Sequence, residues 1–211
     1  PTLDCRLAQE ILLGVGGGRA VRKLGIAIDT YHFNEGHAVF AGVELIAERM
    51  SRGEAFTSAW AAVRDQIVFT THTPVAAGNE VHPLGELRRL GACCELVDGE
   101  MRQIGDDPFN MTVAGLRLAR RANAVSQIHG GVSRNMWSDV TGAADIIAIT
   151  NGVHPPTWQD VRVRDAAGSA DTLWTTHQVL KRELLDEVAL RTGVRLDTDV
   201  LTLGFARRAA S

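Results

Sequence analysis

The chain has 211 residues, of which 45% are hydrophobic and 22% charged, and its formal net charge is −3. This composition is ordinary for a soluble domain with a sizeable core, and the scattered basic residues argue against nucleic acid or an anionic membrane as main partner. No apolar run approaches a transmembrane helix, and the first residues lack the layout of a secretory signal. Three cysteines, Cys5, Cys93 and Cys94, do not suggest a disulfide framework, so we predict a cytoplasmic location.

Both ends of the chain suggest a piece of something larger. An apolar periodic stretch begins almost at once, and the last residues, "DVLTLGFARRAAS", have the pattern of a strand with nothing after it to pair or cover. An unpaired apolar strand at a terminus is a liability in a complete protein. We therefore expect a fragment.

Hydrophobic periodicity predicts helices that alternate with strands along the chain. The expected helices lie near residues 5–24, 37–51, 54–65, 82–91, from "DDPFN" to about 121, 130–139 and 173–192. The expected strands lie at 26–33, 66–71, 123–128 and 145–150, and residues 155–172 are expected to be a polar loop. Such alternation predicts one α/β domain over residues 1–211, with a parallel sheet covered by helices on both faces.

The four predicted strands end in similar chemistry. Their ends read "YHFNEGH", "TTHTP", "SQIHGG" and "ITNGVH", so a His, or an Asn and a His, follows each strand. In an open parallel sheet these carboxyl ends lie along one edge, where ligands bind. Asn, Glu, neutral His and Thr offer directional hydrogen bonds with little fixed charge, which favours a polyhydroxylated ligand such as a sugar.

Other kinds of site find less support. No HExxH or CxxC spacing indicates zinc, and His32, Glu35 and His37 are poorly spaced for a metal, so no metal site is predicted. "GVGGGR" departs from the dinucleotide fingerprint and follows a helical pattern, and no GxSxG elbow is present. The two lysines, Lys23 and Lys181, lie on predicted helix faces, which disfavours a Schiff-base or P-loop lysine.

Longer motifs resemble one family. "YHFNEGHAVFAGVEL", "VFTTHTPVAAGNE", "FNMTVAGLRLARRANAVSQIHGGVSRNMW" and "ITNGVHPPTW" are similar to the α-glucan (glycogen, starch, maltodextrin) phosphorylases in their shorter bacterial form. The resemblance covers nearly the whole chain in the right order. It implies a Rossmann-like fold, here the later part of the N-terminal domain of a two-domain GT-B architecture. The implied reaction of the parent is phosphorolysis of terminal α-1,4-linked glucose to glucose 1-phosphate with retention.

The resemblance also implies roles for particular residues. His72 matches the family's catalytic histidine, whose ring reaches the 6-hydroxyl of the reacting glucose and whose carbonyl faces the developing positive charge. Asn151 matches an asparagine that binds the same 6-hydroxyl, and Val125 matches a residue that lines the glucose pocket. Glu35 and His37 stand where many relatives have an Asp and a His facing the glucan, although the acid here is Glu.

The same resemblance places the cofactor elsewhere. Pyridoxal phosphate serves as a proton relay in the family, and its lysine, like the residues that bind substrate phosphate, is implied to lie beyond this chain. We therefore expect no cofactor-binding residue here, a catalytically inactive isolated chain, and exposed apolar patches that promote a homodimer. Two alternatives stay open: a non-catalytic carbohydrate-binding or regulatory module, and a domain of another glycosyltransferase with the same layout.

Overall fold

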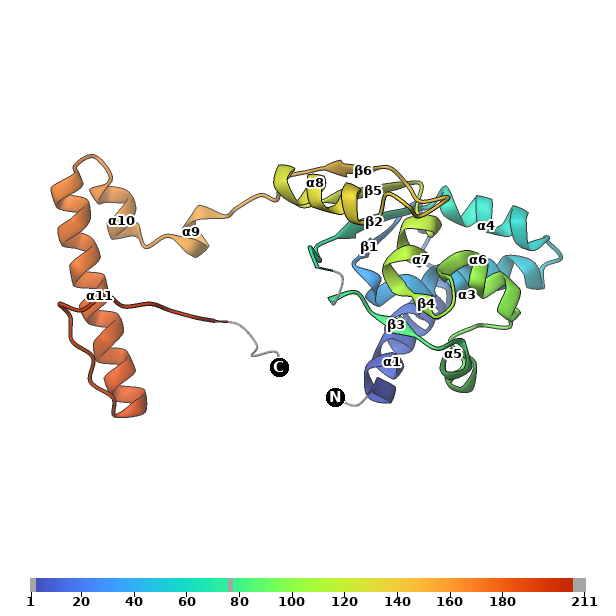
Figure 1. Cartoon of the computed structure of the whole chain (residues 1–211), viewed down its shortest axis with the longest axis horizontal. Helices are drawn as coiled ribbons and strands as arrows, with labels where there is room; N and C mark the ends of the chain where they lie inside the picture. The colour runs from blue at the N-terminus through green and yellow to red at the C-terminus, as the bar shows by residue number, and fades with distance from the viewer. Residues whose placement is uncertain (1–2, 76–77, 207–211) are drawn as a thin grey trace. The chain divides into compact units, whose positions relative to one another are not determined.

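The computed structural model describes residues 3–75 and 78–206, which fall into two compact units. Unit 1 is Pro1–Asn151 and unit 2 is Gly152–Ser211, and each is described by itself (Figure 1). The single partial domain predicted over residues 1–211 stays a prediction. Across the described ranges, no helix combines the length and the apolar character that a membrane span requires.

A parallel sheet forms the centre of unit 1. Among the described residues it has four strands in the order β1-β2-β5-β6: β1 (Tyr31–Asn34), β2 (Ile67–Thr71), β5 (Arg121–Ala124) and β6 (Ile146–Ala148). Phe33 pairs with Phe69 and Phe69 with Ala122, so these apolar side chains share one face, and all three are buried. The α/β class with a parallel, helix-flanked sheet is confirmed.

The strand order follows the chain order, so successive crossovers run in the same direction across the sheet. Because such crossovers are almost always right-handed, they bring their helices to the same face. On the opposite face the side chains of His32, Asn34, Arg121 and Ile147 are exposed. A second, antiparallel pair joins β3 (Val81–His82) to β4 (Phe109–Asn110).

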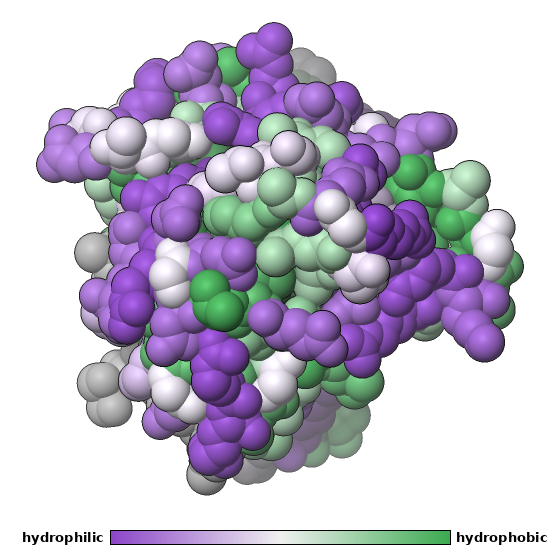
Figure 2. All heavy atoms as spheres, turned by 90° about the vertical axis from the view of Figure 1, so that its right-hand side faces the viewer, coloured by the Kyte–Doolittle hydropathy of each residue, from purple (hydrophilic) through white to green (hydrophobic). Residues whose placement is uncertain are grey.

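The helices of unit 1 lie between and before the strands (Figure 1). Their bounds, for the described residues, are α1 (Leu3–Ile11), the π-helix η1 (Leu12–Gly16), α2 (Gly17–Lys23), the 3-10 helix η2 (Gly36–Ala38), α3 (Val39–Ser51), α4 (Phe56–Arg64), α5 (Leu84–Leu90), α6 (Asp98–Gly105), α7 (Met111–Leu118) and α8 (Gln127–Met136). The rings of Phe40 and Phe109 stack with centroids 6.1 Å apart in the core. Figure 2 shows the molecule from the right-hand side of Figure 1, where hydrophilic side chains surround smaller hydrophobic areas, as expected for helices with one buried face.

Most predicted helices and strands of unit 1 are confirmed within a few residues, with three differences. The strand expected at 26–33 begins at Tyr31, because Tyr31 is the first residue with a partner on β2. The strand expected at 123–128 is β5, which ends at Ala124, since Ser126 caps α8 by accepting a hydrogen bond from the amide of His129. Helix α6 was not predicted.

Unit 2 is helical. Its helices in the described range are α9 (Pro155–Trp158), α10 (Val161–Ala166) and α11 (Ala170–Thr192). The loop predicted at 155–172 is therefore wrong in part, because Pro155 opens a short helix and Asp160 caps another through the amide of Arg162. The guanidinium of Arg162 joins α10 to α11 through both carboxylate oxygens of Glu183, at 2.7 and 2.8 Å.

The described residues near the end of the chain do not form the predicted strand. Residues 199–206 have no strand conformation, and Leu201, Leu203 and Phe205 are exposed, while residues 207–211 lie outside the described ranges. In α11 only Leu185 is buried among the described residues of that helix. Unit 2 thus exposes apolar side chains, as the sequence predicts.

Candidate functional site

Three of the predicted site residues follow adjacent parallel strands. His72 comes directly after β2, Val125 directly after β5, and Asn151 three residues after β6. The amide of Asn151 donates to the carbonyl of Val125 over 3.1 Å, and Ile149 donates to Ala124 over 2.9 Å, so β6 is extended alongside β5. Because the strands are parallel, these residues lie together at the carboxyl edge of the sheet.

Glu35 lies at the same edge, after β1, and its carboxylate binds the end of β2. Its Oε1 accepts the amide of Thr73 at 2.8 Å, the hydroxyl of Thr73 at 3.1 Å and the amide of His72. The backbone of Glu35 has φ 65° and ψ −175°, a region that non-glycine residues rarely adopt. Strain of this kind persists only where the surroundings fix it, and here the carboxylate holds the turn after β2. Direct binding of a sugar by Glu35 stays a prediction.

The residue after Glu35 is glycine for a steric reason. A Cβ at Gly36 would lie 2.7 Å from the Cβ of Met111, the first residue of α7. The absence of a side chain lets η2 pack directly on α7. This close packing fixes the start of η2, and therefore the position of His37 in it.

The side chain of His72 is exposed, whereas its backbone is held by Glu35. The carbonyl of His72 therefore has a defined position. Val125 is half-buried and Asn151 is exposed, so both are accessible at the edge. Their roles toward a ligand stay predictions.

His129, in α8, has a structural environment. Its side chain is buried, its Nδ1 accepts the amide of Val125 at 3.3 Å, and its Nε2 lies 3.1 Å from the hydroxyl of Ser133. Both ring nitrogens are therefore satisfied inside the protein, which supports the turn that carries Val125.

A polar chain across three strands was not predicted as a site. Nε2 of His32 lies 2.7 Å from the hydroxyl of Thr70, which donates to Oδ1 of Asn123 at 2.8 Å. The hydroxyl of Thr70 has one proton, which it donates to Asn123, so it can only accept a hydrogen bond from His32. Nε2 of His32 is therefore the donor to Thr70. In the sequence, each of these three strands carries a polar residue one or two positions before its end, on the face opposite the buried phenylalanines. This pattern is the signal from which the polar chain could have been predicted.

His37 belongs to a group of ionisable residues that we call the Arg6 cluster: Arg6, Glu10, His37, Glu80 and His82. Arg6 lies 3.1 Å from Glu10 and 2.8 Å from Glu80, and Nε2 of His82 donates to Glu10 at 3.2 Å. Burial raises the pKa of Glu10, but the neighbouring imidazoles of His37 and His82 outweigh it and hold the pKa below its usual range. Burial, and then the nearby Glu10, raise the pKa of Glu80.

Part of this cluster has the donor set of a metal site. Within the described residues, Glu10, Glu80 and His82 each offer a ligand atom, and these atoms lie within 4.8 Å of one another. However, the guanidinium of Arg6 already pairs with both carboxylates. The positive charge that a metal ion would supply is thus provided by the protein itself.

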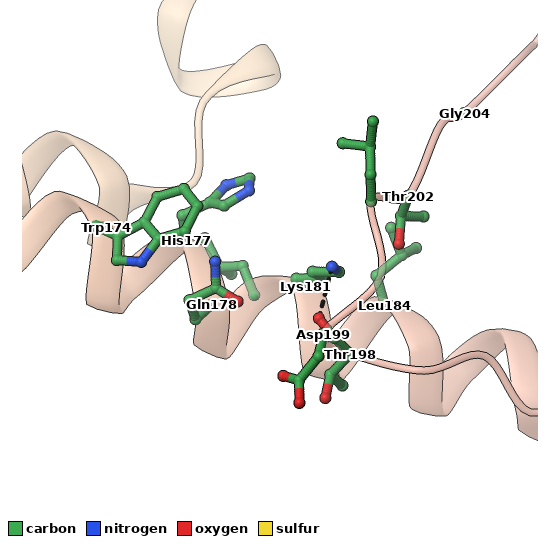
Figure 3. A pocket seen from close by; sticks show the side chains of 11 residues that line it. Trp174, His177, Gln178, Lys181, Leu184, Thr198, Asp199, Thr202 and Gly204 are labelled. Atoms are coloured by element: carbon green, nitrogen blue, oxygen red, sulfur yellow. Dashed lines mark hydrogen bonds between the residues drawn. The ribbon is translucent and has the colours of Figure 1, made fainter.

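Neither lysine occupies a site suited to a carbonyl cofactor. Nζ of Lys181 donates to the carbonyls of Thr198 and Val200 at 2.6 and 2.7 Å, and Lys23 is exposed at the end of α2. Lys181 borders a hollow of about 740 Å³ in unit 2, which α11 forms with residues 198–204 (Figure 3). The hollow is open and is lined by apolar and polar side chains in a mixture, with Trp174 and Leu201 exposed. It contains none of the residues predicted at the sheet edge.

The parallel sheet flanked by helices, with polar residues at its carboxyl edge, defines a Rossmann-like α/β fold. Among known proteins, no family model matches the chain. Maltodextrin phosphorylase of Thermococcus litoralis is 35% identical over 99% of this chain and 30% of its own length. Glycogen phosphorylase of Mycobacterium tuberculosis is 36% identical over 96% of this chain and 31% of its own length. Glycogen phosphorylase of Aquifex aeolicus is 31% identical over 99% of this chain and 38% of its own length.

The chain is thus related, over nearly its whole length, to a segment of the maltodextrin and glycogen phosphorylases. It spans about a third of the length of these curated relatives. The predicted resemblance is confirmed.

Proposed function

We propose that the chain is a segment of an α-glucan phosphorylase, a glycosyltransferase that releases glucose 1-phosphate from terminal α-1,4-linked glucose with retention. The observation that carries this proposal is the contact between Asn151 and Val125, with His72 on the neighbouring strand. These three residues match the family's glucose site, and they come from separate parts of the sequence. In the proposed role they contribute the sugar-binding half of a site.

The mechanism assigned to His72 depends on its backbone as well as its ring. An oxocarbenium-like centre gains from a fixed carbonyl dipole in a site without water. The hydrogen bonds that the amides of His72 and Thr73 donate to Glu35 would fix that dipole, so we propose that Glu35 acts through the main chain of His72. The ring of His72 and the side-chain amide of Asn151 would then bind the 6-hydroxyl, and His37 would face the glucan.

The remaining chemistry is assigned to other parts of a longer protein. We propose that pyridoxal phosphate, which supplies the proton relay to the attacking phosphate, is bound by a lysine outside this chain. The environments of Lys23 and Lys181 support this, since one is exposed on a helix and the other is held by carbonyls. The proposed partners are an α-1,4-glucan, phosphate and glucose 1-phosphate, without nucleic acid or membrane, in the cytoplasm.

Binding of a short glucan tests the sugar site directly. Amide resonances of the chain are followed by NMR during titration with maltopentaose, and we expect shifts at the ends of β2, β5 and β6. His72→Ala and Asn151→Ala should each weaken binding about tenfold, the effect of one hydrogen bond of about 1.4 kcal/mol. His177→Ala, a histidine of α11, is the matched control and should bind as the original chain does. An absence of shifts at the sheet edge would contradict the proposal.

Catalysis is tested separately. With maltopentaose and phosphate, the isolated chain is expected to release no glucose 1-phosphate, and detectable release would overturn the assignment of the cofactor to another part of the protein. A non-catalytic carbohydrate-binding module is the alternative, and it predicts the same binding. The intact mass of the polypeptide in its source cells separates the two: roughly three to four times the 22.8 kDa of this chain supports the phosphorylase, and an equal mass favours the module.

A further inference from the structure

The Arg6 cluster draws its five side chains from three segments of unit 1. Helix α1 supplies Arg6 and Glu10, η2 supplies His37, and β3 with the residue before it supplies His82 and Glu80. The side chains of Glu10 and His82 are only 2% and 1% exposed. Buried ionisable groups of this kind are retained only where they are paired, so the geometry of the cluster is strongly constrained.

Arg6 is the centre of the cluster. Its Nε donates to Glu80 at 2.9 Å and lies 3.1 Å from Glu10, while its Nη2 lies 2.9 Å from Nδ1 of His37. A guanidinium has only donors and keeps its protons at any pH at which the protein is folded. The direction of the last hydrogen bond is therefore settled: Nδ1 of His37 accepts, and the proton of the neutral ring is on Nε2.

Glu10 exerts the opposite influence on the same ring. Its Oε1 lies 3.9 Å from Nδ1 of His37, close enough to favour a proton there. The nearby carboxylate of Glu10 raises the pKa of His37, against the effects of burial and of the Arg6 charge. Two states of His37 thus compete: a neutral ring that accepts from Arg6, and a charged ring that pairs with Glu10.

Among the residues whose side chains the structure describes, the charged groups of α3 and α7, which also pack on η2, are paired elsewhere. In α3, Glu44 pairs with Arg19, and in α7, Arg117 pairs with Asp106. The remaining charged residues of α3 are also paired away from η2, in the ion pairs Arg22–Glu48, Arg52–Glu48 and Arg49–Glu54. The state of His37 is therefore decided within the Arg6 cluster.

We propose that Arg6 is a positioning residue that holds His37 as the neutral tautomer with its proton on Nε2, so that the ring presents a hydrogen-bond donor to a ligand. The side chain of His37 is 47% exposed, so this face is accessible. Glu80 and Glu10 hold Arg6 in place, and His82 holds Glu10. The identity of the ligand, a glucan hydroxyl, rests on the proposed function, whereas the tautomer does not.

The tautomer can be measured without ligand. In the chain labelled with 15N-histidine, long-range 1H–15N spectra at pH 8 report which ring nitrogen carries the proton. We expect His37 to show a bare Nδ1 and a protonated Nε2, and Arg6→Gln to shift the tautomer ratio several-fold toward Nδ1. Arg22→Gln is the matched control, because Arg22 lies in α2 and pairs with Glu44 and Glu48 rather than with a histidine.

Two results would overturn the inference: a proton on Nδ1 in the original chain, or an unchanged ratio in Arg6→Gln. The ring signals of His82 and His129 report whether each variant keeps the fold. If Arg6→Gln does not fold, Arg6→Lys serves instead, since an ammonium keeps the charge but cannot contact both carboxylates and the imidazole together.

A pH titration separates Arg6 from Glu10. Glu10→Gln removes the charge that favours protonated His37, and we expect the midpoint of the His37 titration to fall by about one pH unit. An unchanged midpoint would show that Glu10 does not compete for His37. The outcome is independent of sugar binding, so a failure of the proposed function and a failure of this inference are distinguishable.

Discussion

The carboxylate of Glu35, after β1, accepts the amide of Thr73, after β2, over 2.8 Å. The same oxygen accepts the amide of His72, so one side chain fixes the turn that carries the predicted catalytic histidine. Glu35 tolerates an unfavourable backbone conformation to do so. The carboxylate of Glu35 therefore stabilises this turn whether or not a ligand is bound.

Glu35→Ala should be strongly destabilising. It leaves two amides at the end of β2 without their acceptor, at about 1–3 kcal/mol in free energy of unfolding, as measured by urea denaturation. Glu35→Gly loses the same acceptor but relieves the backbone strain, so it should cost less than the alanine variant. Equal stability of Glu35→Ala and the original chain would show that the contact does not hold the turn.

A pair of glycines in unit 1 should respond oppositely to alanine. A Cβ at Gly115, in α7, would overlap the ring of Phe69 on β2, so Gly115→Ala should cost about 1–3 kcal/mol. Gly131, in α8, has no atom within 4 Å of a Cβ, so Gly131→Ala should stabilise by up to about 1 kcal/mol through helix propensity. Urea denaturation of the two variants side by side measures the difference, and similar effects would contradict the close packing of α7 on β2.

The three thiols should fall into two groups by their rate of reaction with a thiol reagent. Cys5 is exposed, whereas Cys93 and Cys94 are buried. Burial and the neighbouring Glu44 raise the pKa of Cys94 to about 12, and burial raises the pKa of Cys93. We expect one thiol to react rapidly with a disulfide reagent at pH 8 and the other two only after unfolding. Rapid reaction of all three would place the adjacent pair at the surface.

Stability at acid pH should depend on Glu10, whose pKa is lowered by the neighbouring imidazoles of His37 and His82 in spite of its burial. A carboxyl whose pKa falls on folding contributes fully above its unfolded pKa of about 4.3, and this contribution is lost as the pH falls through the folded pKa. The free energy of unfolding should therefore decline less steeply below about pH 4.3 in Glu10→Gln than in the original chain. Glu54→Gln, in the ion pair with Arg49, is the control, and parallel curves for all three proteins would contradict the prediction.

The sequence predicts the sheet of unit 1 well because its strands are bounded by clear signals. Polar residues lie at or shortly after the end of each strand, and the helices between strands carry apolar stripes, as in α3. The convergence of His72, Val125 and Asn151 follows from this topology alone, since parallel strands share an edge. The contact between Glu35 and the amides after β2 could not be predicted, because it depends on the register of two strands and on a rare backbone conformation.

Short helices stabilised by local contacts were missed. Helix α6 is short and buries only two large apolar side chains, Met101 and Ile104, and it begins where the carboxylate of Glu100 accepts the amide of Val97 at 2.8 Å. Helix α10 begins at the cap formed by Asp160. Conversely, the apolar alternation of residues 199–206 is typical of a strand, but the described residues provide no strand beside it. Apolar periodicity identifies a face that can be buried, and tertiary partners decide whether it becomes a strand.

The bond between Asn151 and Val125 also has a mechanical consequence. Asn151 is the last residue of unit 1, and Gly152 begins unit 2. The side chain proposed to bind the 6-hydroxyl therefore belongs to a residue whose main chain is anchored in unit 1 by Val125.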